Sequence, residues 1–456
     1  MTDGESRPTP PTPSRRRFLA AAATGLAATT AGCGYVPGGG DLAWEESLPA
    51  GGLAFASDRW YRATNDRLVT VENHSGRTFD FEDNVWRDLS NAAVSLLTPD
   101  GAARGVGETE RQVTGAPAVT DGAAFLPVEG GRLTAVDLAG GAPSGGGSGA
   151  AEPADRDEGQ SMDDPVRWRV DAGSLLAGEA GDDETTESGD DGADATGSSL
   201  QGVRASDALS VAVGARGVAA FDAQTGDPAF SVPDLWTDAD GGGGTPTDAT
   251  SRVAVDGETV WALIPESASA TDDDDAAVVG YDRSGDGRVE RPVAGDNEWL
   301  VAVGGTVVTG APGASLTGYD RKLDRRFSLD VRAPTTRPSD VPPGEGRLYY
   351  SRGGTVTAVD VDAEEVAFER SDLPSGHFAA DAAGVYVVTN AGGFGDDAEP
   401  RAVAVDPDGA VRWRAPLPEG IEPEGLFAIG ERLVVLDSGR AYGFHAAAGE
   451  RPSLLG

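Results

Sequence analysis

A pattern that returns about every forty residues constrains the fold of this chain more than any other feature of its sequence. Each copy has short runs of alternating apolar residues separated by Gly or Asp turns, and its third run ends in a small residue, an apolar residue and an aspartate. Clear copies end at Asp137, Asp222, Asp282, Asp320, Asp360, Asp406 and, with histidine in place of aspartate, His445. A weaker copy has Thr98 at this point. The pattern predicts four strands in each unit.

The copies are close to evenly spaced, except across the two gaps on either side of Asp222. Four-stranded repeats of roughly 40 to 50 residues are typical of propeller blades. A unit of this size buries its apolar faces only by stacking against its neighbours. We therefore predict an all-β fold, an eight-bladed β-propeller of four-stranded antiparallel blades, with seven blades as the alternative.

Four segments interrupt the repeat with Gly, Ser, Asp and Glu and contain few apolar residues. Such a composition cannot bury enough apolar surface to fold by itself. We interpret these segments as solvated acidic insertions, at residues 139–164, 177–201, 238–250 and 268–276. The rest of the sequence from 42 to 456 is predicted to form a single propeller domain.

Residues 42–49 have the pattern of an outer strand but belong to no unit of their own. Propellers commonly close their ring with an N-terminal strand that joins the last blade, because this pairing hides two strand edges at once. We therefore expect residues 42–49 to complete the blade that contains His445. Residues 450–455 are the alternative candidate for the same place.

One repeat shows the turn after the third strand most clearly, with Asp222 followed by Thr225 and Gly226. This unit resembles the repeat of the pyrroloquinoline quinone (PQQ) type of propeller, in which an aspartate and a Thr-Gly turn precede an outer-strand tryptophan. The matching outer-strand positions hold Phe230, Trp168 and Trp413. The resemblance covers roughly residues 42–456 and implies a fold more than a function.

The chain is strongly acidic, with 75 Asp and Glu against 36 Lys and Arg and a formal net charge of −39. Lys322 is the only lysine, and this combination resembles proteins of salt-loving archaea. Molar salt shortens the Debye length to about 3 Å and screens such repulsion, so we expect unfolding at low salt. Nucleic-acid binding is excluded as a function, because no segment supplies clustered Lys and Arg.

The start of the chain resembles a twin-arginine export signal. Its residues are Ser14, Arg15, Arg16, Phe18 and Leu19, and an apolar run follows from residue 20 to residue 31. The alternative is the start of a transmembrane helix, but the run is shorter than the roughly 20 residues that span a bilayer. We therefore predict that residues 1–32 form a lipoprotein signal peptide.

Cys33 is the only cysteine, so the chain can form no intrachain disulfide. Its setting, Thr-Ala-Gly-Cys, resembles a lipobox, which implies that the Cys33 thiol carries lipid; a buried small residue is the alternative. Residues 33–41 are rich in glycine and are predicted to form a flexible tether. The protein is therefore expected at the cell membrane, anchored by lipid and facing the exterior.

The resemblance raises the possibility of a quinoprotein dehydrogenase, which binds PQQ over the propeller axis with a vicinal disulfide, calcium-ligating carboxylates and a catalytic aspartate. This chain cannot form the disulfide, and no segment matches the metal-binding constellation. The three histidines, His74, His377 and His445, lie in different units without ligand-like spacing. We assign no catalytic, cofactor-binding or metal-binding residue and expect no cofactor.

One segment has the oxygen spacing of the start of a calcium loop, formed by Asp282, Ser284, Asp286 and Gly287. Val293 stands where such a loop needs a bidentate acid. Because Asp282 also matches the turn position of the other repeats, a hairpin turn is the favoured interpretation.

Our first functional hypothesis is a non-enzymatic, membrane-tethered propeller that binds another protein or an envelope component of unknown identity. The propeller itself is expected to be a monomer. It resembles the PQQ-repeat lipoproteins that act in envelope assembly. The alternative is an enzyme or small-ligand binder that uses the central funnel, as a degenerate quinoprotein or a hydrolase. Inward-pointing carboxylates above a tryptophan at the base of the funnel would favour the enzyme or ligand binder. A funnel lined by small apolar groups would favour the non-enzymatic scaffold.

Overall fold

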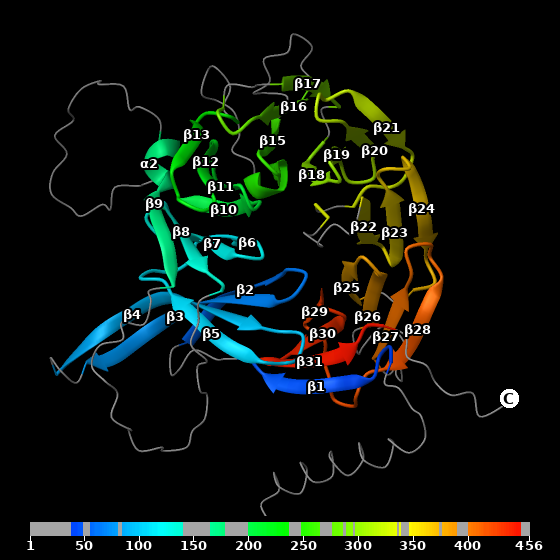
Figure 1. Cartoon of the computed structure of the whole chain (residues 1–456), viewed down its shortest axis with the longest axis horizontal. Coiled ribbons are helices and arrows are strands. Elements are labelled where there is room, and N and C mark those ends of the chain that lie inside the picture. The colour runs from blue at the N-terminus through cyan, green and yellow to red at the C-terminus, as the bar shows by residue number, and fades with distance from the viewer. Residues whose placement is uncertain are drawn as a thin grey trace, which may run out of the picture.

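Eight antiparallel sheets stand around a central axis in the computed structural model (Figure 1). The structure describes residues 38–48, 55–80, 84–139, 165–177, 199–236, 248–264, 276–285, 289–294, 297–334, 337–338, 346–373, 376–389 and 400–447. The predicted eight-bladed β-propeller is thereby confirmed, and the seven-bladed alternative is wrong.

The first four blades run in chain order from the inner strand to the outer strand. Blade 1 contains β2 (Phe55–Ala63), β3 (Leu68–Asp80), β4 (Val85–Leu97) and β5 (Ala103–Glu108). Blade 2 contains β6 (Ala118–Val119), β7 (Ala123–Val128), β8 (Arg132–Asp137) and β9 (Val166–Asp171). Blade 3 contains β10 (Leu200–Ala205), β11 (Leu209–Gly214), β12 (Val218–Asp222) and β13 (Pro228–Val232), and blade 4 contains β14 (Val253–Asp256), β15 (Thr259–Ile264), β16 (Ala276–Tyr281) and β17 (Val289–Val293).

The last four blades complete the ring. Blade 5 contains β18 (Trp299–Val303), β19 (Thr306–Gly310), β20 (Leu316–Tyr319) and β21 (Arg325–Leu329), and blade 6 contains β22 (Arg347–Arg352), β23 (Thr355–Asp360) and β24 (Glu365–Arg370). Blade 7 contains β25 (Gly376–Asp381), β26 (Gly384–Thr389), β27 (Arg401–Val405) and β28 (Val411–Pro416). Blade 8 contains β29 (Gly425–Ile429), β30 (Arg432–Asp437), β31 (Arg440–His445) and β1 (Leu42–Ser47). Two short helices, α2 (Ala172–Leu176) and η1 (Ala249–Arg252), lie between blades.

Blade 6 has three strands among the described residues, whereas each of the other sheets has four. Its first described strand, β22, corresponds to the second strand of the other blades, because β23 ends at the repeat aspartate Asp360. The sequence before β22 contains Pro338, Pro342 and Pro343. Proline has no N–H to donate to a strand ladder, so this stretch is poorly suited to an inner strand.

The ring closes as predicted, because β1 pairs antiparallel with β31 and forms the outer strand of blade 8. The turn just before β1 is fixed to the same blade, since Gly40 N–H donates to the His445 carbonyl at 2.9 Å. The residues from Gly38 onward in the expected tether therefore belong to the ring. The alternative closing segment, residues 450–455, lies outside the described part of the chain.

The apolar core is divided into eight clusters, and each cluster lies between two consecutive blades. Phe221 of blade 3, for example, packs in one cluster with Phe125 and Leu133 of blade 2. The last cluster joins Leu68 of blade 1 to Val434 of blade 8. Stacking between blades therefore buries the apolar faces of the strands, as the repeat length predicted.

The repeat aspartates organise the turn between the third and fourth strands. The Asp222 carboxylate accepts hydrogen bonds from Gln224 N–H and Thr225 N–H, each at 2.9 Å. Burial alone would raise the pKa of Asp222, but these backbone bonds hold it below its ordinary value. Equivalent bonds to backbone N–H groups are made by Asp282, Asp320, Asp360 and Asp406. The motif thus has a structural role.

An aromatic residue on the outer strand of one blade locks onto this turn in the next blade. The Trp168 indole N–H donates to the Ala223 carbonyl at 3.2 Å, and its ring covers Gly226, which has a φ of 77°. A Cβ on Gly226 would lie 2.7 Å from that ring, so only glycine fits there without strain. The same lock joins Trp44 to Pro99 and Gly101, and Trp413 to Ala446 and Gly39.

Candidate functional site

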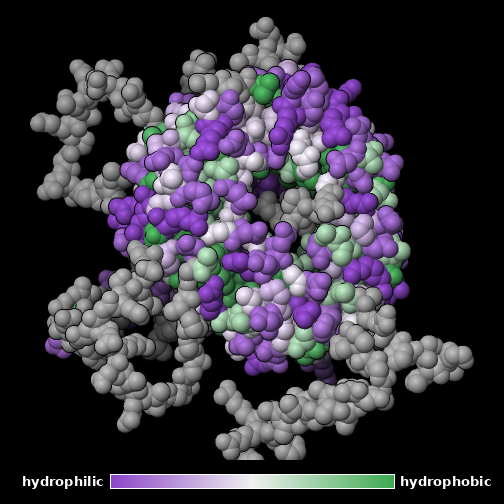
Figure 2. All heavy atoms as spheres, viewed as in Figure 1, coloured by the Kyte–Doolittle hydropathy of each residue, from purple (hydrophilic) through white to green (hydrophobic). Residues whose placement is uncertain are grey.

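Two cavities lie along the propeller axis, where Figure 2 shows a hollow near the centre of the ring. One has a volume of about 350 Å³ and is lined by the inner strands of blades 1 to 5 and by β22 of blade 6. The other has a volume of about 500 Å³ and is lined mainly by blades 1, 3, 7 and 8 and by η1 with its cap residue Asp248. Small apolar residues form much of the first wall, namely Ala63, Ala118, Val119, Ala205, Ala254, Val255, Val301, Ala302 and Val303.

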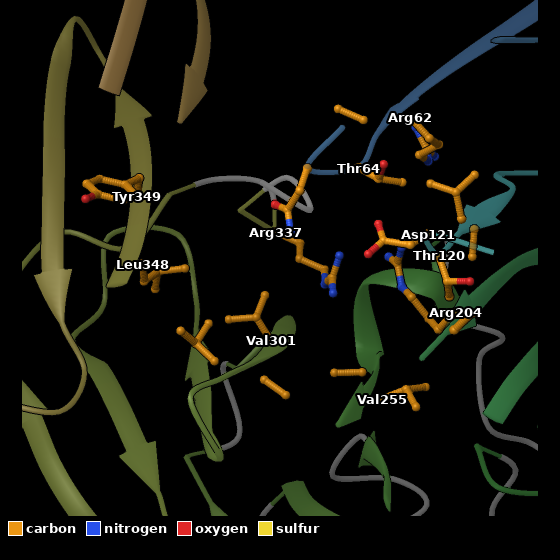
Figure 3. Close-up of a pocket in the computed structure, with 18 of the residues that line it drawn as sticks. Arg62, Thr64, Thr120, Asp121, Arg204, Val255, Val301, Arg337, Leu348 and Tyr349 are labelled. Atoms are coloured by element: carbon orange, nitrogen blue, oxygen red, sulfur yellow. The ribbon is translucent and has the colours of Figure 1, made fainter. Parts of the chain in front are cut away.

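Three arginines line both cavities, so the cavities adjoin at these side chains. Arg62 comes from β2, Arg204 from β10, and Arg337 from the segment that precedes blade 6. All three are half-buried. Figure 3 shows Arg204 and Arg337 extending into the first cavity from different sides, with Asp121 close by. The first cavity therefore combines these arginines with the Asp121 carboxylate.

Backbone carbonyls fix the orientation of these arginines. Arg62 Nε donates to the Pro117 carbonyl at 2.9 Å, and Arg204 Nη2 donates to the Thr250 carbonyl at 2.7 Å. Arg337 Nε donates to the Leu300 carbonyl at 2.9 Å. Each bond runs from one blade or connection to a neighbouring one, so the positions of the guanidinium groups are set by the ring itself.

Two further polar groups of blade 6 face the first cavity. Arg347 forms an ion pair with Asp360, with a separation of 3.3 Å between Nη2 and Oδ2. Tyr349 lies in the same strand, and burial raises the pKa of its hydroxyl above the ordinary value. Tyr349 therefore stays protonated at neutral pH and presents a hydrogen-bonding hydroxyl rather than a charge.

The channel does not fit the PQQ site of quinoprotein dehydrogenases. No tryptophan is among the described residues that line the two cavities, and Trp236, Trp261 and Trp299 are buried between blades instead. The single cysteine rules out a vicinal disulfide. Within the described ranges, no group of three or more His, Cys, Asp and Glu side chains is placed to hold a metal ion.

The sequence motif that resembled a calcium loop forms a tight turn. Ser284 N–H and Ser284 Oγ both donate to Asp282 Oδ1, at 2.9 and 2.6 Å. Gly285 N–H donates to the Asp282 carbonyl at 2.9 Å. These bonds match the favoured hairpin-turn interpretation. Asp286 and Gly287 lie outside the described residues.

The residues predicted for export and lipid attachment also lie outside the described residues; they are Ser14, Arg15, Arg16, Phe18, Leu19 and Cys33. In the part of the chain that the structure describes, no helix has the length and apolar character needed to cross a membrane. The three histidines lie in three different blades, in β3, β25 and β31.

A feature that the sequence did not lead us to expect is the long hairpin of blade 1. β3 and β4 are each 13 residues long and pair along their whole length, so their far ends project from the ring (Figure 1). Val85 and Trp86, near the tip, are 44% and 60% exposed. They are two of the four large apolar residues that stand out as exposed in the described ranges.

Partly buried polar contacts hold the base of this hairpin. Glu72 pairs with Arg59 of β2 at 2.5 Å, and Asn91 Nδ2 donates to Glu108 Oε2 of β5 at 2.8 Å. His74 lies directly opposite Asn91 in the β3–β4 ladder and is buried. The hairpin is therefore fastened to both neighbouring strands of blade 1 before it leaves the ring.

Comparison with known proteins finds distant similarity to solved structures. BamB from Moraxella catarrhalis is 14% identical with a TM-score of 0.44, over 88% of this chain and 98% of that one. Quinohemoprotein alcohol dehydrogenase from Comamonas testosteroni is 14% identical with a TM-score of 0.46, over 90% of this chain and 77% of that one. No family model and no curated protein matches the chain. The eight-bladed ring is established by the strand pairing within its eight sheets.

Proposed function

We propose that this chain is an exported β-propeller of haloarchaeal type, anchored by lipid on Cys33 at the outer side of the cell membrane, that binds another protein rather than catalysing a reaction. The observation that carries the proposal is the projecting β3–β4 hairpin, with Trp86 60% exposed near its tip. The finer parts of the proposal, export and lipid attachment, rest on the sequence motifs at residues 14–19 and 30–33.

The hairpin has the properties of a protein-binding element. Tryptophan supplies a large contact area and is enriched among the residues that dominate interface energies. Trp86 stands on β4, and its partner strand β3 is held at the base of the hairpin by the Arg59–Glu72 ion pair. Little conformational entropy is therefore lost when a partner orders the hairpin. A directly paired arginine and aspartate, Arg77 and Asp88, lie 3.2 Å apart midway along the arm and add a polar rim.

The anchor would hold the ring close to the membrane. Gly38 is already fixed in the ring through the turn that contacts blade 8. Only five residue steps separate it from Cys33, and an extended chain spans at most about 3.6 Å per step. The edge of the ring near β1 would therefore lie within about 18 Å of the lipid attachment point, and the partner would be a membrane or envelope protein.

The small apolar residues on the channel walls favour the scaffold function over a quinoprotein-like enzyme. The enzyme was expected to have inward-pointing carboxylates above a tryptophan at the base of the channel. Among the described lining residues, Asp121 is the only carboxylate of the first cavity. The second cavity adds Asp248, whose carboxylate caps η1 by accepting from Thr250 N–H, and Glu424. Neither arrangement resembles a pair of acids poised over a cofactor.

Affinity capture from membranes in molar KCl tests the proposal. The full chain should recover a stoichiometric protein partner, and Trp86→Ser should abolish that recovery. Val289→Ser is the matched control, because Val289 is another exposed apolar residue, 38% exposed, on the outer strand of blade 4. Recovery of the partner by Trp86→Ser, or no stoichiometric partner with the unchanged chain, would overturn the assignment to the hairpin.

A further inference from the structure

The outer edge of β4 indicates how the hairpin contacts its partner, an inference that rests on the proposed function. β5 pairs with β4 only as far as Ala93, and Thr109 N–H then donates to the Ala92 carbonyl at 2.8 Å. From Val85 to Asn91, no described strand pairs with this side of β4. We propose that an extended segment of the partner protein adds here as a new strand, beside β4 and in line with β5.

The first argument is the direction of the backbone groups on this edge. Ala92 points its N–H and C=O toward the β5 side, since its N–H donates to Thr109 Oγ1 at 3.0 Å and its carbonyl accepts from Thr109 N–H. Successive residues of a strand point these groups alternately to its two sides, so Ser90 and Asp88 point theirs the same way as Ala92. Both residues are exposed. The edge therefore presents the backbone donors and acceptors that an added strand binds.

The second argument is that this edge lacks the features that usually prevent strand addition. Natural proteins protect exposed edges with proline, β-bulges or very short strands. The β3–β4 ladder runs from Leu68 to Asp80 of β3 without a shift of register, and residues 85–91 contain no proline. The Asp88 charge is paired within the hairpin, 3.2 Å from Arg77. A long regular edge of this kind promotes nonspecific association unless it has a defined occupant.

The third argument is a groove beside this edge that contains an unsatisfied polar atom. The groove has a volume of about 570 Å³ and is lined by residues 88–91 of β4, residues 109–111 and Glu129 of blade 2. Asn91 is only 8% exposed, and its Oδ1 atom accepts no hydrogen bond from the described residues. Its Nδ2 atom donates to Glu108 Oε2 at 2.8 Å, which fixes the orientation of the amide.

This groove decides between the two edges of the hairpin and indicates the chemistry of the added segment. None of the described lining residues belongs to β3, so the groove marks the β4 edge. A buried carbonyl oxygen without a donor costs free energy. The segment that fits is therefore an extended one with a donor side chain, such as Ser, Thr, Asn or Gln, placed to reach Asn91 Oδ1.

Affinity capture from membranes in molar KCl, with one substitution on the edge, tests the inference. Ser90→Pro removes a backbone N–H that points away from β3, so it blocks strand addition and keeps the β3–β4 ladder. We expect it to reduce recovery of the partner about tenfold or more. Ser90→Ala is the matched control, because it keeps the N–H, and it should recover the partner as the unchanged chain does. Full recovery by Ser90→Pro, or an equal loss with both variants, would overturn the inference.

Hydrogen exchange on the recovered complex is a second measurement, which decides the matter if circular dichroism shows that Ser90→Pro does not fold. Strand addition should slow exchange about tenfold or more within residues 84–92, with little change in residues 74–80 on the other strand. Unchanged exchange in residues 84–92 would sink the added strand, whereas loss of capture by Trp86→Ser would still support the proposed function. If the unchanged chain recovers no partner, both proposals fail.

Discussion

Between the blades of the ring, each apolar cluster joins two neighbouring sheets, whereas the outer part of the blade 1 hairpin leaves Val85 and Trp86 exposed to solvent. Both regions are built from alternating strands, and β3 and β4 run through both of them without a break. Their inner halves carry Val69, Val71 and Val94 into the core of the ring. The difference teaches that strand pairing alone does not stabilise this fold; burial between blades does.

Removing salt should produce the largest effect, because it acts on the whole ring at once. The formal net charge of −39 is screened over about 3 Å in molar salt but over about 30 Å at 0.01 M. We expect far-UV circular dichroism to show a folded β-protein in molar KCl and a cooperative loss of that signal after dialysis into low salt. A sharp thermal transition that persists at low salt would mean that burial between blades outweighs the repulsion.

A truncation inside a blade interface should be the most costly single substitution. Phe221 is fully buried between blades 2 and 3. Phe221→Ala removes most of its side chain and leaves a cavity, so we expect the free energy of unfolding to fall by about 3–5 kcal/mol. Chemical denaturation in constant high salt measures this loss. A loss below about 1 kcal/mol would show that the interface relaxes and that the contrast with the hairpin is overstated.

Glycine turns beneath the aromatic locks should come next. Gly226→Ala forces a non-glycine residue to a φ of 77° and drives a Cβ to within 2.7 Å of the Trp168 ring. We expect a loss of about 2–4 kcal/mol, from backbone strain and overpacking together. Gly257→Ala is the matched control, since Gly257 has a φ of 59° but nothing within 4 Å of the added Cβ. Equal losses in the two variants would show that the lock itself adds nothing.

Much of this ring could be predicted from the sequence because the repeat encodes contacts between consecutive units. The repeat step, which ends in aspartate in blades 2 to 7, in Thr98 in blade 1 and in His445 in blade 8, located the third strand of each blade. The isolated outer strand before the first unit located the closure at β1. The outer-strand aromatic positions were also recognisable, and Trp168 and Trp413 both form locks. These features depend on local spacing, which a single sequence shows directly.

The two candidate sites could not be predicted in the same way. The hairpin of blade 1 continues the strand alternation past the ring, so nothing in residues 68–97 marks where burial ends. The channel site joins Arg62, Arg204 and Arg337, which are far apart in the chain and meet only after the ring has closed. Arg337 also belongs to a proline-containing segment rather than to an inner strand. Only the closed ring shows which inner residues share the axis.

The repeat aspartate should have a smaller, pH-dependent effect. The pKa of Asp222 is lowered in the folded protein, because backbone N–H bonds outweigh the opposing effect of burial. Its stabilising contribution is therefore present above the unfolded pKa of about 3.9 and disappears as the pH falls through the lower, folded value. Asp222→Asn should be less stable than the unchanged chain near neutral pH, and the thermal midpoints of the two should converge on acidification. A constant difference at all pH values would argue against a charge effect.

The smallest change in stability is expected for the residue with the largest proposed effect on binding. Trp86 is 60% exposed in the folded chain, so Trp86→Ser removes little buried area and should change the free energy of unfolding by no more than about 0.5 kcal/mol. Denaturation in high salt, run beside Phe221→Ala, measures the difference. A loss approaching that of Phe221→Ala would mean that the hairpin tip packs against the ring, and any loss of partner capture by Trp86→Ser would then reflect folding. An unchanged stability with lost capture separates the binding arm from the core that supports it.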